Sequence, residues 1–496
     1  MPDKIEVVLD QRLRDLLARL AAFFNDRNVE AYGTGGLVRD VLRRVPVHDL
    51  DISIAADPLV VGRELAGDFQ GSYFALDEQR RAARIIVPAQ DLHIDLLPLR
   101  GDIGADLRER GYTVDAMAAP LAEIASGRIA LIDPTGGRKD LSDGVIRVVR
   151  EQALVDDPLR LLRGVRLATQ LDFRIEPATA GLVERHAQLL NSAAVERQRD
   201  ELTLIFATQR AAQGLRLMDA LGLLRFVLPE LDVTRDVEQP KEHHFDVFGH
   251  SLAAVGALDW LMTQSEPASQ PQRRLWAHLW SQLDRQLVID YFREIVVPGT
   301  PRLAVLKLTA LLHDIGKPES KSVEESGRMR FFGHADAGAE IAVTLMQRLR
   351  FSSREVTLVR SMIQAHLRPL LMAQRGAPSH RAIYRFFRDT EGAGIDTLFL
   401  SLADHLATVG PRIDMDGWRR HVAVVSYILL KRFQEPTVIT PAKLLDGEDL
   451  MAELDLPPGP RIGELLELVR EAQAAAEITT KEEGLALARR HLPPGP

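Results

Sequence analysis

The chain has 496 residues, of which 46% are hydrophobic and 27% are charged, with a net charge of −8 and no cysteine. This composition is typical of a soluble, cytoplasmic protein of several domains, because no apolar run approaches the roughly 18 residues of a membrane span and residues 1–20 lack an export signal. The absence of cysteine excludes disulfides and thiolate metal sites, so any metal must be bound by His, Asp or Glu, and the acidic charge argues against a uniformly basic nucleic-acid-binding protein.

The first 145 residues show the pattern of a mixed α/β domain. Apolar residues recur with helical spacing over residues 11–28, and residues 29–44 are typical of a short strand, a glycine turn and a helix. We expect an α/β head over residues 1–145. Its further expected strands cover residues 49–55, 74–79, 83–89, 92–99 and 127–134.

The rest of the chain is predominantly helical. Helical periodicity runs almost without interruption from Asp157 onward, except over residues 262–300, whose polar composition indicates an insertion. Breaks in the periodicity near residues 235 and 410 separate three helical parts. These are a neck at 146–235, a domain at 236–410 and a tail at 411–496.

A glycine turn precedes the helix that carries Arg39. Gly35 and Gly36 allow the backbone to approach a phosphate closely, the start of a helix favours anions, and Arg39 offers a bidentate donor. Glycines at such a turn are also explained by chain geometry alone. The turn therefore needs a second feature before it indicates a phosphate site.

Paired aspartates supply that feature. Asp49 and Asp51 occupy positions i and i+2 of an expected strand, so both lie on one face, about 7 Å apart. Two such carboxylates suit two-metal phosphoryl transfer, in which one ion activates a 3′-hydroxyl and the other neutralises charge on a triphosphate. Asp95, in the expected strand 92–99, would supply a third carboxylate. We expect these three aspartates to be catalytic.

The two motifs together resemble those of the class II tRNA nucleotidyltransferase and bacterial poly(A) polymerase family, within the polymerase-beta superfamily. The family pattern G-G-x-V-R-D followed by D-x-D matches residues 35–40 and 49–51. The resemblance implies a mixed sheet, Mg²⁺ at the aspartates, and template-independent addition of CMP and AMP from CTP and ATP to the 3′ end of tRNA. The implied nucleotide contacts in this region are Gly35, Gly36 and Arg39.

A second family motif near the sugar is only partly kept. The family pattern R-R-D-F-T-x-N-A corresponds to residues 109–116, which read E-R-G-Y-T-V-D-A. Arg110 keeps its implied role as a donor to the nucleotide, whereas Asp115 stands where the family has Asn. These departures motivate an alternative in which the head binds RNA without catalysing addition.

The start of the neck carries a candidate base-reading pair. Residues 156–163, D-D-P-L-R-L-L-R, are similar to the family motif E-D-x-x-R, in which an Asp and an Arg contact the Watson–Crick edge of the incoming base. The resemblance gives these roles to Asp157 and Arg160. An aspartate accepts from the cytosine amino group, and a guanidinium donates to ring nitrogen and carbonyl acceptors. Arg163 and Arg166 extend the basic stripe at three-residue steps and are expected to bind the nucleotide as well.

The domain at 236–410 contains histidines and aspartates in the order of the HD phosphohydrolase superfamily, which it resembles. His and carboxylate ligands suit a divalent transition metal or Mg²⁺, and metal-bound water would attack a phosphate ester. Cyclic or terminal phosphates on damaged RNA ends and free nucleotides are both possible substrates, and residues 243–244 are expected outside the ligand set. The expected ligands are His250, His313, Asp314, His334, His366 and Asp404.

The resemblance is compatible with more than one product. Members of this family add CCA, add CC only, or act as poly(A) polymerases. CCA-adding members usually carry a flexible loop where this chain has residues 101–105, so the short connection resembles that of CC-adding enzymes. The charged segment 77–84 is an alternative source of the same mobility. The tail at 411–496 resembles the RNA-proximal tail of the family, and the sequence gives no indication of oligomeric state.

Overall fold

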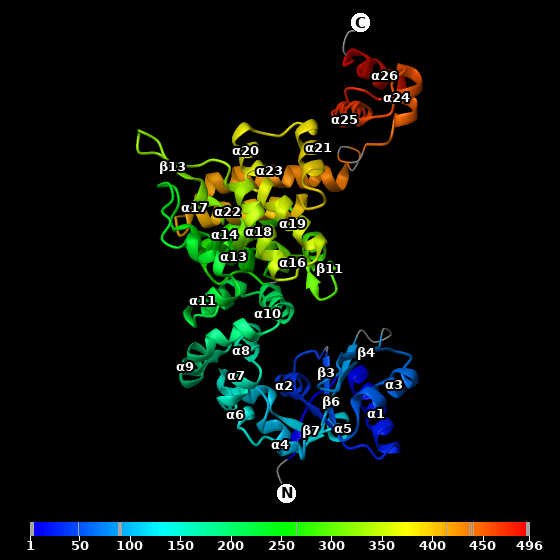
Figure 1. The fold of residues 1–496 in the computed structure, drawn as a ribbon, viewed down its shortest axis with the longest axis vertical. Helices are drawn as coiled ribbons and strands as arrows, with labels where there is room; N and C mark the ends of the chain where they lie inside the picture. The colour runs from blue at the N-terminus through cyan, green and yellow to red at the C-terminus, as the bar shows by residue number, and fades with distance from the viewer. Residues whose placement is uncertain are drawn as a thin grey trace. The chain divides into compact units, whose positions relative to one another are not determined.

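The computed structural model describes residues 4–47, 49–87, 92–263, 265–412, 414–435, 437, 439 and 441–492. Contacts divide the chain into two compact units, which we call the head unit and the helical unit (Figure 1). The head unit comprises Met1–Ala193 and Ala220–Phe226, and the helical unit comprises Ala194–Asp219 and Val227–Pro496. No helix among the described residues is long and apolar enough to cross a membrane.

The head unit is built on a mixed sheet, as the resemblance predicts, and this sheet has six strands. The expected strand 127–134 is not part of it, because only Arg128–Ile129 form a strand there, β8, which pairs with β1 (Ile5–Glu6). The strand order of the sheet is β4-β5-β6-β3-β2-β7, in which β3 and β6 pair in parallel and the other neighbours are antiparallel. The strands are β2 (Ala31–Thr34), β3 (Asp49–Ile54), β4 (Ser72–Asp77), β5 (Ala82–Val87), β6 (Leu92–Pro98) and β7 (Ala118–Pro120). The expected strand 83–89 forms up to residue 87, and residues 88 and 89 lie outside the described residues.

Alternation along β3 separates core residues from polar ones. Leu50, Ile52 and Ile54 are fully buried and belong to the head core, whereas Asp49 and Asp51 occupy the alternate positions. Successive strand residues point to opposite faces of a sheet, so burying the apolar set places both aspartates on the other face. The burial of three apolar side chains therefore fixes the face that carries the carboxylates.

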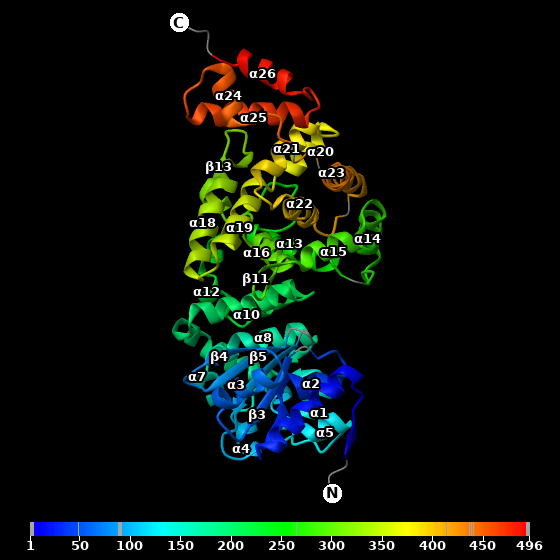
Figure 2. The same ribbon diagram turned by 90° about the vertical axis from the view of Figure 1, so that its right-hand side faces the viewer.

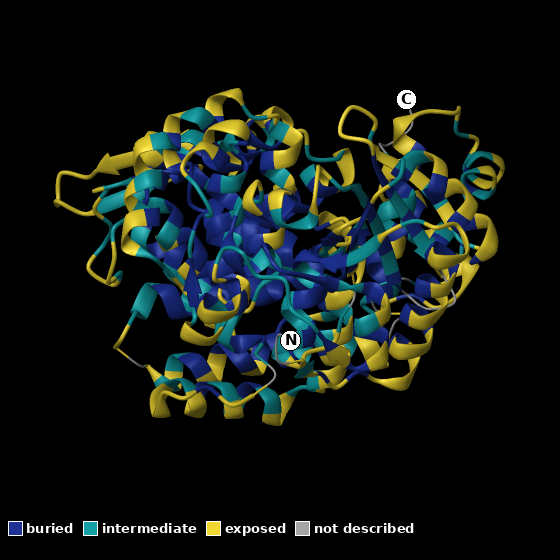
Figure 3. Ribbon diagram, turned by 90° about the horizontal axis from the view of Figure 1, so that it is seen from below, coloured by how far each residue is buried: buried dark blue, intermediate teal, exposed yellow. Residues whose placement is uncertain are grey.

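Helices cover the head sheet and complete its core. The amphipathic helix α1 (Gln11–Asp26) packs on α5 (Leu121–Ser126), and α2 (Gly35–Arg43) follows the glycine turn. Helix α3 (Pro58–Asp68), for which the sequence analysis assigned no element, packs on β5 and starts with Asp57 as N-cap and Pro58 at its first turn. Figure 3 shows the buried residues in dark blue and the exposed outer faces of helices in yellow.

The remaining elements of the head unit include helices that follow the sheet in the chain. Helix α4 (Ile103–Arg108) begins after a connection of only four residues, 99–102, beyond β6. The remaining elements of this unit are η2 (Thr113–Asp115), α6 (Gly137–Asp143), α7 (Gln152–Asp156), α8 (Arg160–Leu171), α9 (Pro177–His186), η3 (Ala187–Ser192) and the short pairs β1 (Ile5–Glu6) with β8 (Arg128–Ile129) and β9 (Val145–Ile146) with β10 (Arg174–Ile175).

The helical unit begins with α10 (Val195–Ala207) and continues almost entirely as helices. Two of them, α14 and α15, occupy the polar segment 262–300, so this segment has regular structure despite its weak periodicity. The central helices are α13 (Val247–Leu261), α14 (Gln270–Gln282), α15 (Arg285–Arg293), α16 (Arg302–Leu312), α17 (Lys317–Ser320), α18 (His334–Arg348), α19 (Ser353–Ala365), α20 (Arg368–Arg375), α21 (His380–Asp389), α22 (Gly394–Val409) and α23 (Met415–Gln434). Short elements are α11 (Ala211–Ala220), α12 (Leu224–Val227), η4 (Pro229–Thr234), β11 (Ile295–Val297), β12 (Thr300–Pro301), β13 (Lys321–Val323) and β14 (Met329–Phe331).

The C-terminal helices have a small core of their own. Helices α24 (Gly447–Leu454), α25 (Pro460–Ala474) and α26 (Lys481–Arg490) gather side by side in Figure 2 and bury Leu450, Leu465 and Val469 among them. Helix α25 also contacts α21, where Arg385 forms a bidentate ion pair with Glu471. Helices α24, α25 and α26 therefore form a packing cluster of their own within the helical unit, with charged contacts to α21.

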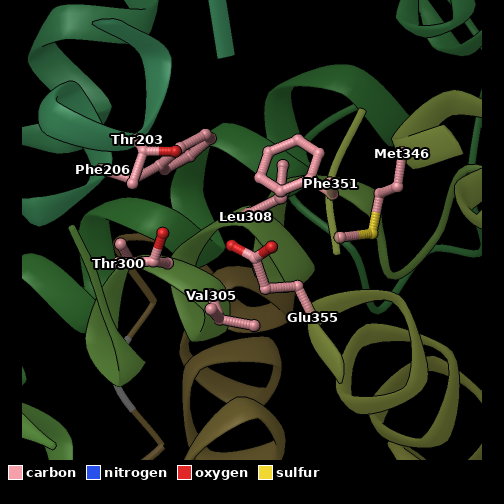
Figure 4. Close-up of a pocket in the computed structure, with 9 residues that line it drawn as sticks. Thr203, Phe206, Thr300, Val305, Leu308, Met346, Phe351 and Glu355 are labelled. Carbon is pink, nitrogen blue, oxygen red and sulfur yellow. The ribbon is translucent and has the colours of Figure 1, made fainter. Parts of the chain in front are cut away.

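A small, mainly apolar cavity of the helical unit lies near α10, α16 and α19 (Figure 4). Its lining includes Phe206, Leu308 and Met346, with the carboxylate of Glu355 pointing toward it. Glu355 is already used in a capping box with Ser352 at the start of α19. Buried polar groups with satisfied hydrogen bonds are structural by default, and this cavity holds none of the predicted site residues.

Candidate functional site

The three predicted carboxylates of the head lie on neighbouring strands. The parallel register of β3 and β6 places Asp51 opposite Asp95, and Asp49 opposite His93. Asp49 has a 60% exposed side chain and lies 3.3 Å from the His93 Nδ1 atom. Both oxygens of Asp95 accept hydrogen bonds of 2.7 Å from Arg84 on β5. The sheet thus brings the aspartates together and gives Asp95 a cationic partner that sequence reasoning missed.

The glycine turn holds the second aspartate directly. The Gly36 N–H donates to Asp51 Oδ2 over 2.9 Å. A Cβ atom at Gly35, which has a φ of +57°, would lie 2.8 Å from the same oxygen. Burial raises the pKa of Asp51 to about 6 against the hydrogen bond from Gly36, and the Asp95 carboxylate adds to the rise. A bound cation would relieve this accumulation of negative charge, so the donor set fits a divalent metal.

Arg39 lies beside the turn, held by two carboxylates. Its guanidinium donates to both oxygens of Asp40 over 2.9 Å and to Asp115 over 2.6 Å. Asp115 thus carries the negative charge that faces Arg39, at the position where the family has Asn. Arg110 donates to Ser53 over 2.9 Å and to Asp106 over 3.1 Å. Both predicted arginines border the Gly35–Asp51 contact, because a Cβ on Gly35 or Gly36 would also meet a guanidinium nitrogen.

The predicted base-reading pair lies where α7 gives way to α8. Asp157 follows α7 and is buried, and its Oδ2 atom accepts from Arg80 NH1 over 3.3 Å. Arg160 is the first residue of α8 and donates to the carbonyl of Ala153 over 3.2 Å. Burial is the main cause that lowers the pKa of the Arg160 guanidinium. Arg80, in the turn between β4 and β5, belongs to the charged segment 77–84, but the sequence analysis gave it no role of its own.

The partly kept motif at 109–116 packs against Arg160. The Tyr112 hydroxyl donates to the carbonyl of Arg160 over 2.6 Å. A Cβ atom on Gly111 would lie 3.1 Å from Arg160 Cδ, and one on Gly164 would lie 2.1 Å from the Tyr112 hydroxyl. The Gly and Tyr that depart from the family pattern therefore both contact this residue, so the departures fit the neighbouring helix.

Arg163 and Arg166 continue along α8 at three-residue steps and are half-buried. Arg166 donates to Gln170 over 2.9 Å. The two arginines share a helix face with Arg160, as the spacing predicts.

The six residues predicted as ligands in the domain at 236–410 converge in the helical unit. They form three overlapping groups, in each of which the ligand atoms lie within 4.8 Å of one another. His250 comes from α13, His313 and Asp314 follow α16, His334 opens α18, His366 follows α19 and Asp404 lies in α22. Figures 1 and 2 both show these helices together.

Asp314 is the centre of this cluster. Its carboxylate lies 3.3 Å from the Nε2 atoms of His250 and His313, and 3.5 Å from that of His334. Asp404 lies 3.0 Å from His250 Nε2. Protonated His313 and Lys317 hold the pKa of Asp314 well below its usual range, despite the opposing effect of burial. Positively charged neighbours therefore stabilise the buried carboxylates of this cluster, as a bound metal ion would.

The histidine rings are oriented by the backbone. The Nδ1 atoms of His313, His334 and His366 hydrogen-bond to carbonyl oxygens over 2.9, 2.7 and 2.6 Å, which leaves each Nε2 toward Asp314. His334 Nε2 is buried and has no hydrogen-bond partner among the described residues. Ligating histidines commonly have their second nitrogen fixed in this way. The orphaned nitrogen and the donor chemistry both fit a divalent metal.

Lys317 is a neighbour of the cluster that the sequence analysis quoted without a role. Its ammonium lies 2.5 Å from Asp314 Oδ2 and donates to Gln239 over 2.7 Å. The spacing in H-D-I-G-K could have predicted this contact, because a lysine three residues after Asp314 returns to the same side of the turn. His243 contacts the His250 ring and lies outside the three ligand groups, as expected.

Comparison with known proteins shows the family to which this chain belongs. The family described as the poly A polymerase head domain matches residues 31–147, and a second family, described as the probable RNA- and SrmB-binding site of polymerase A, matches residues 172–234. The A-adding tRNA nucleotidyltransferase of Deinococcus radiodurans is 34% identical over 92% of this chain and 94% of that protein. The chain belongs to the tRNA nucleotidyltransferase family. The CC-adding enzyme of Thermus thermophilus is also 34% identical, over 92% of both chains.

Solved structures of tRNA nucleotidyltransferases share the fold. The Thermotoga maritima CCA-adding enzyme in complex with tRNA has a TM-score of 0.56 at 22% identity, covering 99% of both chains. A CCA-adding enzyme in complex with CTP has a TM-score of 0.60 at 21% identity, covering 99% of this chain and 100% of that chain. These likenesses confirm the predicted nucleotidyltransferase head followed by helical regions. The two relatives at 34% identity make the chain an enzyme of this family.

The HD domain family matches residues 287–409 of this tRNA nucleotidyltransferase. The match contains five of the six converging residues, whereas His250 precedes it and joins the cluster through α13. Both the nucleotidyltransferase head and the HD domain belong to families that use divalent metals, in agreement with the two donor sets.

Proposed function

We propose that this enzyme adds nucleotides from CTP or ATP to the 3′ end of tRNA without a nucleic acid template, using two Mg²⁺ ions in the head. The observation that carries the proposal is the register of Asp51 beside Asp95, with Asp49 on the same face and Gly36 donating to Asp51. When bound, the ions would lower the pKa of the attacking 3′-hydroxyl and neutralise charge on the triphosphate. We also propose a cytoplasmic location, which a role in processing of tRNA ends supports.

The residues of the chain divide this task. Asp49 and Asp51 would supply carboxylate oxygens to the metals, and Asp95, held by Arg84, would complete the carboxylate set. Gly35 and Gly36 leave room for phosphate oxygens beside the turn, where Arg39 and Arg110 supply positive charge and donors. Their present carboxylate partners keep both guanidinium groups fixed before the nucleotide arrives.

Base selection belongs to the neck. Asp157 accepts from the amino group of the incoming base, and Arg160 donates to its ring nitrogen and carbonyl acceptors. Arg163 and Arg166 extend the positive stripe of α8 toward phosphate or RNA. We assign these tasks to a catalytic head at 1–145, a base-reading and RNA-binding neck at 146–235, a metal-binding domain at 236–410 and an RNA-proximal tail at 411–496.

We further propose that CMP is the nucleotide transferred. The four-residue connection at 99–102 is too short for the large movement that would change the base pocket from accepting cytosine to accepting adenine. CC-adding relatives from Thermus thermophilus and Geobacter sulfurreducens each cover at least 90% of both chains, at 34% and 31% identity. AMP addition is the second candidate, favoured by the A-adding relative at 34% identity.

One assay separates these products. The full-length protein is incubated with tRNA lacking all, two or one of its terminal residues, with CTP, ATP or both, and products are resolved at single-nucleotide length. CC addition predicts products that end at the second cytidine even when ATP is present. Efficient AMP addition to tRNA ending in CC would overturn CMP specificity, and long adenylate tails would indicate poly(A) polymerase activity.

The cluster in the helical unit supports a second activity. We propose that His250, His313, Asp314, His334, His366 and Asp404 bind divalent metal for hydrolysis of a phosphate ester. Four imidazoles favour a transition metal such as Mn, Fe, Co, Ni or Zn over Mg²⁺. Hydrolysis of bis(p-nitrophenyl) phosphate, measured with each metal after chelator treatment, tests this assignment, and a rate independent of every metal would contradict it.

A further inference from the structure

The turn between β4 and β5 reaches the base-reading aspartate of the neck. Arg80, within the turn at residues 78–81, donates from NH1 to Asp157 Oδ2 over 3.3 Å. The two residues are separated by 77 positions in the sequence. This hairpin therefore contacts the residue to which the proposed function gives base selection.

The turn is arranged so that Arg80 faces Asp157. Asp77, the last residue of β4, accepts from the Arg80 backbone N–H over 2.9 Å and lies 3.7 Å from its Nε atom. The pairing of β4 with β5 shifts register between Ala75 and Asp77, so a bulge redirects the hairpin at this point. The next residue, Arg81, has a φ of +55° and turns to Asp57 at the start of α3. Two adjacent arginines of one turn thus serve different carboxylates.

Burial makes the contact with Asp157 consequential. The Asp157 side chain is 9% exposed, whereas that of Arg80 is 47% exposed. A buried carboxylate is stabilised by charged partners that also restrict its orientation. Arg80 supplies such a partner from the solvent side, on an element that does not belong to the neck.

We propose that Arg80 is a positioning residue that sets the orientation of Asp157 and so contributes to nucleotide choice. The inference rests on the proposed role of Asp157. A carboxylate in a fixed orientation accepts from the amino group of cytosine or adenine and opposes the carbonyl that uracil presents instead. When Arg80 is absent, Asp157 loses one of the charged partners that restrain its carboxylate, and the selection against UTP weakens. The β4–β5 hairpin thus restrains the base pocket in a chain whose β6–α4 connection is too short to reshape it.

The test compares neighbouring arginines of the full-length protein. Arg80→Ala, Arg80→Lys and the matched control Arg81→Ala are assayed for kcat and KM with UTP and with whichever of CTP or ATP the wild type transfers to truncated tRNA. We expect Arg80→Ala to lower the ratio of kcat/KM for the correct nucleotide over UTP by about fivefold, in keeping with a partly exposed ion pair. Arg80→Lys keeps the charge and recovers most of the ratio, and Arg81→Ala leaves it unchanged.

The possible failures are distinguishable. Equal ratios in Arg80→Ala and Arg81→Ala, within about twofold, would overturn the proposal. A fall of kcat/KM by one common factor for all nucleotides would also overturn it, because that result indicates a structural role only. If the wild type transfers no nucleotide, or if Asp157→Asn keeps wild-type selection, the proposed function fails first and the role of Arg80 falls with it.

Discussion

The two proposed metal sites of this enzyme are built in opposite ways. In the head, Asp49 and Asp51 lie on one strand and the glycine turn is 15 residues from Asp51, so most of the site is a local motif. In the helical unit, the cluster joins residues as far apart as His250 and Asp404, brought together by five helices or helix ends. One site depends on strand alternation and the other on tertiary packing.

The surroundings differ as well. Asp49 is 60% exposed, whereas His250 and His313 are fully buried and Asp314 is 1% exposed. A carboxylate pair with one exposed member suits ions that arrive with a nucleotide triphosphate and leave with pyrophosphate. A buried cluster with oriented histidines suits an ion that stays with the protein. From this difference we expect metal ions to exchange at the head site and to be retained at the HD cluster.

The largest expected effect comes from the head carboxylates. Asp51→Ala removes a metal ligand candidate and the acceptor of the Gly36 N–H, so nucleotide addition should fall by about a thousandfold or more. Asp49→Ala should behave in the same way. Metal-dependent phosphate hydrolysis should stay at the wild-type rate, because its cluster lies in the other unit. Addition by the double variant at the wild-type rate would refute the assignment.

The reciprocal variant sharpens the comparison from the other side. Asp314→Ala removes the centre of the buried cluster, so bound metal measured by elemental analysis and phosphate hydrolysis should both fall to below about a hundredth of wild type. Nucleotide addition should continue. Asp336→Ala, which changes an exposed aspartate of α18, is the matched control. Equal metal content and equal hydrolysis in Asp314→Ala and wild type would contradict the proposal that Asp314 binds the metal.

The third prediction concerns the free-energy cost of burying the ionised Asp51 carboxylate when no metal is bound. Its pKa rises from 3.8 to about 6 in the folded protein, so the folded state binds more protons between these values and stability falls as pH rises through this window. Asp51→Asn should therefore be more stable than wild type above pH 6, by roughly 1–3 kcal/mol in chelator, and lose this advantage near pH 4. Added Mg²⁺ should restore the stability of the wild-type protein.

Urea unfolding in EDTA at pH 4 and 7.5 measures this difference. Asp49→Asn on the same strand is the control, because its carboxylate is largely exposed. A stability gain of Asp51→Asn that is the same at both pH values would show that burial of the charge is not its cause.

The fold followed from the sequence where short-range patterns specify it. Alternation of Leu50, Ile52 and Ile54 identified β3 and the face that carries the aspartates. Helix α3 was not assigned, although Asp57 and Pro58 provide the usual signals of a helix start. The two helices in residues 262–300 have weak apolar periodicity, so tertiary packing rather than the local pattern stabilises them.

The site followed from the sequence only where its residues lie within a motif. The ion pair of Arg84 with Asp95 depends on the pairing of β5 with β6, and the contact of Arg80 with Asp157 joins residues 77 positions apart. Neither partner is visible from spacing, because strand register and chain reversal decide them. The departures at Gly111 and Tyr112 suggested erosion of a motif, whereas the structure shows that both residues contact Arg160.

The smallest expected effect concerns Tyr112. Tyr112→Phe removes only the hydroxyl that donates to the Arg160 carbonyl over 2.6 Å, a hydrogen bond worth about 1 kcal/mol. We expect kcat/KM for nucleotide addition to fall by about fivefold, because the start of α8 loses a contact that fixes Arg160. Tyr73→Phe is the control, since the Tyr73 hydroxyl is buried without a hydrogen-bond partner among the described residues. An equal loss of activity in both variants would mean that the Tyr112 hydroxyl does not position Arg160, whereas loss in Tyr112→Phe alone would connect the altered motif of the head to base recognition in the neck.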